Sequence, residues 1–129
     1  MIVTGQFVYV VPDVGVEPHP GIVIAVSDDK TRVLVICGTG TKWSEFNPVL
    51  IDPFKPDGAS AAKYLTKPTY FHLNGVRSCD IGSLDTTRRP FTKCPNSKWV
   101  RVKLLAVDGC RARVAEPDYR QWLSVVAGE

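Results

Sequence analysis

The sequence lacks the features that identify several classes of protein. No apolar stretch reaches the roughly 18 residues that suggest a membrane-spanning helix, so no span is predicted. The first residues, Met-Ile-Val-Thr-Gly-Gln, have neither the charged region nor the long apolar region of a signal peptide. We therefore expect a cytoplasmic protein that does not bind a membrane.

Metal-binding and nucleotide-binding motifs are also missing. The chain has 4 cysteines, none of them in a Cys-x-x-Cys pair, and only 2 histidines, which argues against a zinc site. The P-loop, GxGxxG, HExxH and Gly-x-Ser-x-Gly motifs do not occur. We expect reduced, mostly buried thiols, and neither a metal nor a cofactor.

Basic residues are absent from the N-terminal end and concentrated later in the chain. Residues 1–29 carry four acids and no lysine or arginine, whereas residues 77–113 carry nine basic residues and three acids. This asymmetry, within a net charge of only +3, is consistent with a basic face that binds a polyanion. The alternative interpretation is that these are ordinary solvated side chains of strands and loops.

Short apolar segments bounded by turn residues make up most of the chain. Two runs rich in β-branched residues, 20–26 and 32–41, flank a polar turn and predict a central hairpin that is buried on both faces or forms part of a barrel. The other expected elements are strands over 6–11, 69–73, 76–84 and 99–107, turns at Asn74-Gly75 and Asp108-Gly109, and two helical turns over 59–65 inside an irregular segment, 42–68.

The C-terminal segment has the pattern of a helix over about residues 116–127. Tyr119, Trp122, Leu123 and Val126 recur at helical spacing, and Pro117 suits the first turn. We take the shared face of those four residues as core packing. The whole pattern predicts a single domain over residues 1–129, mainly β, folded as a small SH3-like barrel with a C-terminal α-helix.

The candidate site residues flank the central hairpin. His19 directly precedes its first strand, and Thr39 and Thr41 end its second strand. Because the strands of a hairpin are antiparallel, these residues meet at one rim of the sheet. Lys42 and Trp43 follow, and an exposed tryptophan at a basic rim would stack on a base. The alternative interpretation is that the two threonines only form a turn, that Trp43 belongs to the core, and that His19 is held between two prolines for backbone reasons.

Four segments resemble, in order, those of a known family. The resemblance covers about residues 5–90, and its most specific part is the late segment with Arg77, Asp80, Asp85 and Arg88. The family is that of the MazF/PemK-type endoribonuclease toxins of bacterial toxin–antitoxin systems. The four segments are 5–10, 15–24, 35–41 and 76–89.

The resemblance implies an SH3-like barrel that cleaves single-stranded RNA without a metal, by attack of a 2′-hydroxyl on its own phosphate. It assigns catalysis to Thr39 and to the position before Pro20, where this chain has His19 and the family has arginine. It also implies a cytoplasmic homodimer and a small antitoxin protein whose disordered segment fills the RNA groove. The RNA-binding residues expected around these two are Thr41, Lys42, Trp43, Arg77, Arg88 and Arg89.

Two functions follow from the histidine at the arginine position. Histidine exchanges protons near neutral pH, as metal-free RNA cleavage requires, so the chain can be an active nuclease with His19 as acid or base. Arginine supplies a permanent forked charge that histidine does not replace, so the chain can instead be an inactive barrel that binds nucleic acid or protein. His72, inside a predicted strand, is expected to be structural or a surface residue.

Overall fold

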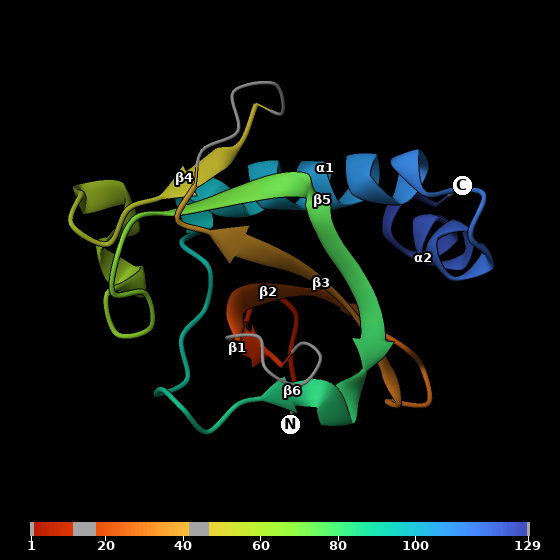
Figure 1. Cartoon of the computed structure of the whole chain (residues 1–129), viewed down its shortest axis with the longest axis horizontal. Coiled ribbons are helices and arrows are strands. Elements are labelled where there is room, and N and C mark those ends of the chain that lie inside the picture. The colour runs from red at the N-terminus through yellow and green to blue at the C-terminus, as the bar shows by residue number, and fades with distance from the viewer. Residues whose placement is uncertain (1, 12–17, 42–46, 129) are drawn as a thin grey trace.

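The computed structural model describes residues 2–11, 18–41 and 47–128, which form one sheet and two α-helices (Figure 1). The predicted site residues Lys42 and Trp43 lie outside the described residues. The strands are β1 (Phe7–Val10), β2 (His19–Val26), β3 (Arg32–Thr39), β4 (Val49–Ile51), β5 (Thr69–Asp80) and β6 (Leu84–Asp85); the helices are the 3₁₀ helices η2 (Pro56–Ala61) and η3 (Ile81–Ser83) and the α-helices α1 (Asn96–Ala112) and α2 (Pro117–Ala127).

The sheet is antiparallel, with the strand order β4-β5-β3-β2-β1-β6. The predicted central hairpin is β2 and β3, whose register pairs Gly21 with Cys37 and Val26 with Val33. A mainly β fold with a C-terminal helix is thus confirmed. The SH3-like barrel is not confirmed, because among the described residues the outer strands β4 and β6 do not pair and the sheet stays open.

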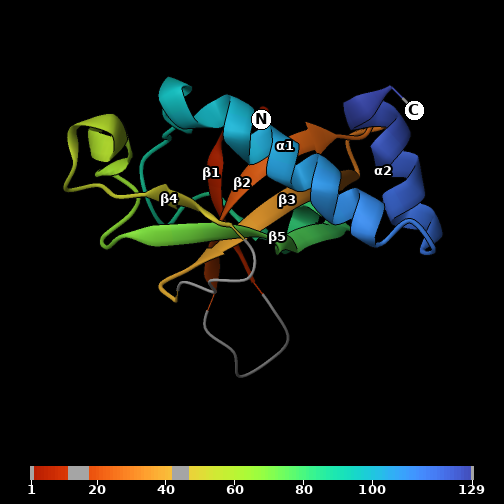
Figure 2. The ribbon, with the colours of Figure 1, turned by 90° about the horizontal axis from the view of Figure 1, so that it is seen from above.

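The central strands are buried on both faces, as their apolar sequences predict. One face, with Ile22, Leu34 and Ile36, packs with α1 and α2 in the main core. Figure 2 shows α1 extending along this side of the sheet, with α2 beside its C-terminal end. The other face forms a smaller cluster around Val23 and Val35.

The prediction of a hairpin turn at Asn74-Gly75 is wrong, because both residues lie inside strand β5. The chain continues through both residues as a single strand of 12 residues, which bends sharply (Figure 1). On β3, Ile36 pairs with Val76 and Gly38 pairs with Phe71, so the extra residues of β5 form an irregularity at the bend. Gly75 is needed because a Cβ there would lie 2.5 Å from the main-chain oxygen of Cys37.

The predictions of a strand over residues 99–107 and of a turn at Asp108-Gly109 are wrong, because both stretches lie inside helix α1. The alternation of that stretch is compatible with a strand, but its buried residues recur at spacings of three and four, which is the helical period. Val100 and Leu104, which a strand here would place on one face with the buried Val102 and Ala106, are 61% and 59% exposed. The buried residues of α1 are Val102, Leu105, Ala106, Gly109 and Cys110.

Helix α2 is the predicted C-terminal helix, and it ends at Gly128 in the left-handed conformation (φ 70°). Tyr119, Trp122 and Leu123 are buried, and Val126 packs against the same core, which confirms the predicted face. None of the described helices is both long enough and apolar enough to cross a membrane. All four cysteines are free thiols, of which Cys37 and Cys79 are half-buried and the other two are buried.

Candidate functional site

His19 and Thr39 lie at one rim of the sheet, as the hairpin predicts. Gly21 pairs with Cys37, so the two residues beyond that pair on each strand face each other across the ladder. His19 is exposed and Thr39 is half-buried. Both line a groove of about 340 Å³, and both also line a smaller hollow of about 230 Å³ beside it.

Lys67 supplies positive charge to the larger groove and was not among the site residues predicted from the sequence. A Cβ placed on Gly40 would lie 3.3 Å from the Lys67 Nζ, so the ammonium group sits directly over the end of β3. The pairing of Thr39 with Tyr70 explains this position, because it brings the chain before β5 back to that end. Because β3 and β5 are far apart in the sequence, no local pattern places Lys67 at this site.

Arg77 supplies positive charge to the smaller hollow, where His19 and Thr39 are also present. Its Nη1 donates to the carbonyl oxygens of Asn74 (2.9 Å) and Val76 (2.8 Å), which fixes the guanidinium at the bend of β5. Within the described part of the chain it forms no ion pair. The structure therefore joins His19, Thr39 and Arg77, as predicted.

The thiol of Cys37 also lines the smaller hollow. Burial raises the pKa of Cys37 to about 11, and the positive charge of Arg77 only partly opposes this effect. The thiol is therefore protonated near neutral pH. Because the thiolate is the reactive form of cysteine, Cys37 is not suited to act as a nucleophile here.

His72 holds the end of β3 rather than facing solvent. It is 2% exposed, and its Nε2 lies 3.2 Å from the carbonyl oxygen of Thr41, which requires that this nitrogen carry the hydrogen. The N–H of Thr41 in turn donates to the Thr39 Oγ1 over 3.3 Å. These contacts shape the turn at the rim and leave Thr41 itself exposed.

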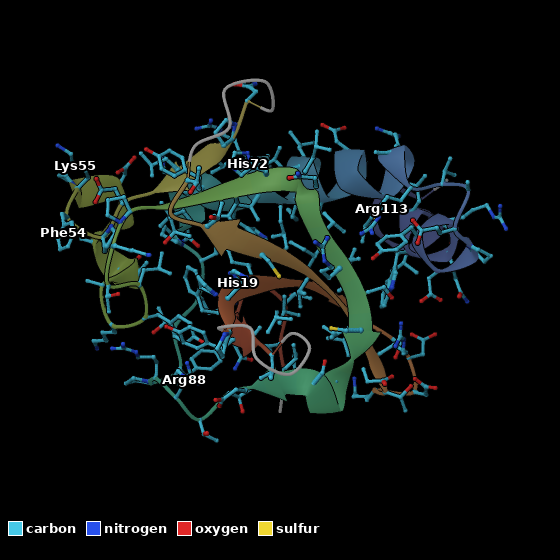
Figure 3. The ribbon with its side chains drawn as sticks, in the orientation of Figure 1. His19, Phe54, Lys55, His72, Arg88 and Arg113 are labelled. Carbon is cyan, nitrogen blue, oxygen red and sulfur yellow. The ribbon has the colours of Figure 1, made fainter. Side chains whose placement is uncertain are left out.

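The two arginines predicted after β6 have different positions. The guanidinium of Arg88 lies over the Tyr9 ring, 4.8 Å from its centroid, and Tyr9 lines the larger groove. Arg88 also pairs with Asp85 at 3.5 Å. Arg89 is exposed next to it but lines none of the three hollows to which His19 contributes. Figure 3 shows Arg88 and His19 on the half of the molecule opposite to α2.

The side chains gathered at the rim can bind an anion and exchange a proton next to it. Lys67 and Arg77 provide two positive charges, Thr39 provides a hydroxyl, and His19 provides a group that accepts and donates protons. A phosphate diester between the two cations would therefore meet donors on both sides. Across residues 2–11, 18–41 and 47–128, no three His, Cys, Asp or Glu side chains gather in an arrangement that could hold a metal ion.

Comparison with known proteins adds no assignment to this geometry. The chain matches no protein-family model, and no curated protein matches it. A functional assignment therefore depends on the rim itself and on the sequence pattern of residues 5–90.

Proposed function

We propose that this protein binds single-stranded RNA across the rim at His19 and Thr39 and cleaves it, as the MazF/PemK-type toxins do. The observation that carries the proposal is that an exposed histidine and a threonine line the same hollows, with Lys67 beside one and Arg77 beside the other. The partners included in the proposal are a second copy of the chain and an antitoxin protein that covers the rim.

The proposed reaction uses the 2′-hydroxyl of the RNA as the nucleophile. His19, in its neutral form, takes the proton of this hydroxyl as the 2′-oxygen bonds to the adjacent phosphorus. The bond from phosphorus to the 5′-oxygen then breaks, and the 5′-oxygen takes a proton from water. The products are a 2′,3′-cyclic phosphate and a 5′-hydroxyl, and His19 returns its proton to solvent.

The cations at the rim stabilise the charge that develops during this step. The phosphorane carries more negative charge than the diester, so fixed donors bind it more strongly than they bind the substrate. Arg77 is held by two backbone carbonyl groups before RNA binds, and Lys67 lies close to Gly40 at the end of β3. Thr39 adds a hydroxyl donor to a non-bridging phosphate oxygen.

One observation favours a second candidate, a barrel-like module that binds RNA without cleaving it. His19 is the one histidine exposed in the described part of the rim, whereas His72 is buried and bonds to the Thr41 carbonyl oxygen at the end of β3. Cleavage requires that the 2′-oxygen lose a proton and that the 5′-oxygen gain one. A rim with one histidine therefore depends on water for one of these two proton transfers.

An RNA with a single 2′-deoxy nucleotide at a mapped cleavage position separates the two candidates. The nuclease should cut the all-ribose strand and leave the substituted strand intact, while it binds both with similar affinity. A Thr39→Val variant should bind the RNA and cut it more slowly, with kcat falling more than KM rises. Binding without cutting of any ribose strand would leave only the binding module.

A further inference from the structure

A second groove, of about 480 Å³, lies next to the rim and is not used by the proposed reaction. Phe91 stands in its wall with 61% of its surface exposed. Such exposure is unusual for a phenylalanine, and it leaves an aromatic face available to a ligand. The polar and charged side chains of the groove come from two segments and are Ser60, Lys63, Thr92, Lys93 and Asn96.

The backbone on either side of Phe91 is fixed, so the exposure of the ring does not result from a loose chain. The N–H of Phe7 donates to the Thr92 carbonyl oxygen (2.9 Å), and the N–H of Cys94 donates to the Gly5 carbonyl oxygen (2.7 Å). These bonds attach the segment between β6 and α1 to the edge of β1. The fold thus presents Phe91 outward at a defined place.

The chain segments that line this groove carry more basic than acidic side chains, and two of the basic ones, Lys63 and Lys93, line it directly. Residues 52–68 and 86–93 contain six basic side chains and two acidic ones. One of the acids, Asp57, is already paired with Lys98 at 2.9 Å. Among the described residues, five of the six cations form no ion pair, and only Arg88 does. The five are Lys55, Lys63, Lys67, Arg89 and Lys93.

A mostly buried aromatic stack lies between the second groove and the rim. Tyr64 stacks on Phe7 and on Tyr9, with ring centroids 5.2 Å and 5.1 Å apart. Tyr9 lines the groove at His19, while Lys63, adjacent to Tyr64 in the chain, lines the second groove. The exposed Arg88, which lies over the Tyr9 ring (4.8 Å), precedes Phe91 by only three residues, so the second groove and the groove at His19 are neighbours.

We infer that the second groove binds a further nucleotide of the same RNA strand. Phe91 stacks on its base, and Lys63 and Lys93 contact the flanking phosphates. The inference extends the proposed function to a second contact region on the same chain. Stacking on an aromatic ring tolerates every base, so this contact lengthens the bound strand without adding sequence preference.

The test measures binding of a fluorescent single-stranded RNA of 12 nucleotides, and of a dinucleotide, to the full chain and its variants. Stacking of one base contributes about 1–3 kcal/mol, so Phe91→Ala should weaken binding of the long strand by roughly 10- to 100-fold. Binding of the dinucleotide, which occupies only the rim, should stay the same. Phe91→Tyr should retain the affinity for the long strand.

Phe54→Ala is the matched control, since Phe54 (labelled in Figure 3) is 74% exposed just before η2 and does not line the groove. Equal affinities of the Phe91→Ala and Phe54→Ala variants for the long strand would overturn the inference. So would Phe91-dependent binding of a poly-glutamate peptide without RNA binding. Circular dichroism confirms that each variant is folded.

The outcomes for this groove and for the reaction at the rim are separable. Cleavage that depends on His19 but not on Phe91 would overturn the second groove and support the reaction. Binding that depends on Phe91, with no cleavage of the long strand, would support the second groove and contradict the nuclease.

Discussion

Replacement of Gly109 by alanine tests how α1 packs on the sheet. A Cβ at this position would collide with the main-chain oxygen of Leu73 and would lie 2.5 Å from the Val76 Cγ2. The main-chain oxygen belongs to β5 and cannot rotate away. Overpacking of this kind costs about 1–3 kcal/mol, and we place this collision in the upper half of that range because backbone must move.

The same substitution has an opposing effect, which sets the net magnitude. Alanine is favoured over glycine inside a helix by about 0.8–1.0 kcal/mol. The expected result for Gly109→Ala is therefore a loss of about 1–2 kcal/mol in the free energy of unfolding. Urea denaturation followed by tryptophan fluorescence measures this difference, because the chain has three tryptophans.

Gly82→Ala is the matched control, since nothing lies within 4 Å of a Cβ at that glycine. It should leave stability unchanged or raise it by up to about 1 kcal/mol. If Gly109 instead occupied a turn between a strand and the next element, the two variants would behave alike. A Gly109→Ala protein as stable as the wild type would refute the close contact between α1 and β5.

Three further predictions concern the core, the thiol and the rim. Tyr119→Phe removes the hydroxyl that accepts from the Ser78 N–H (3.1 Å) and from Arg113 (2.8 Å), so it should lower the free energy of unfolding by about 1–3 kcal/mol in urea titrations; an unchanged midpoint would contradict this. Because the pKa of Cys37 is raised to about 11, its alkylation by iodoacetamide at pH 8 should be about 100-fold slower than that of a thiol with the usual pKa of 9.0. The rate, measured by mass spectrometry of the modified peptide, should increase as the pH rises toward 11. Rapid alkylation of the folded protein at pH 8 would contradict this prediction. Lys67→Met should weaken RNA binding and make it less dependent on salt, whereas Lys30→Met, at the other end of the β2–β3 hairpin, should not; equal effects in fluorescence anisotropy titrations would show that Lys67 has no special role.

The sequence predicted the elements whose patterns are local and unambiguous. The hairpin over β2 and β3 has two long apolar runs around a polar turn, where Asp29 accepts hydrogen bonds from Ser27 and Thr31. The C-terminal helix has proline in its first turn and glycine after its last. Both predictions depended on residues close together in the chain, and both were confirmed.

The prediction for α1 failed because a short stretch can fit two periods. Over residues 99–107 the apolar side chains alternate, as in a strand, and only the longer window that includes Gly109 and Cys110 shows the helical spacing. Asp-Gly is a common turn pair, so Asp108-Gly109 reinforced the error. The glycine is there instead because the helix approaches the main chain of β5.

The site was predicted only as far as the hairpin determines it. His19 and Thr39 follow from the pairing of β2 with β3, which the chain makes through one short turn. Lys67 reaches the rim through the pairing of β3 with β5, two strands far apart in the sequence. No local pattern marks such a pairing, so the cation of the larger groove could not be identified without the structure.

Cleavage of RNA by the wild type and by His19→Ala, in excess EDTA, tests the central proposal most directly. A long single-stranded RNA should be cut at discrete positions to 2′,3′-cyclic phosphates by the wild type. The His19→Ala variant should be inactive, bind RNA with little change, and regain activity when imidazole is added. Wild-type protein that is folded and binds RNA but cuts none, or a His19→Ala variant that cuts as fast as the wild type, would contradict the proposed role of this rim.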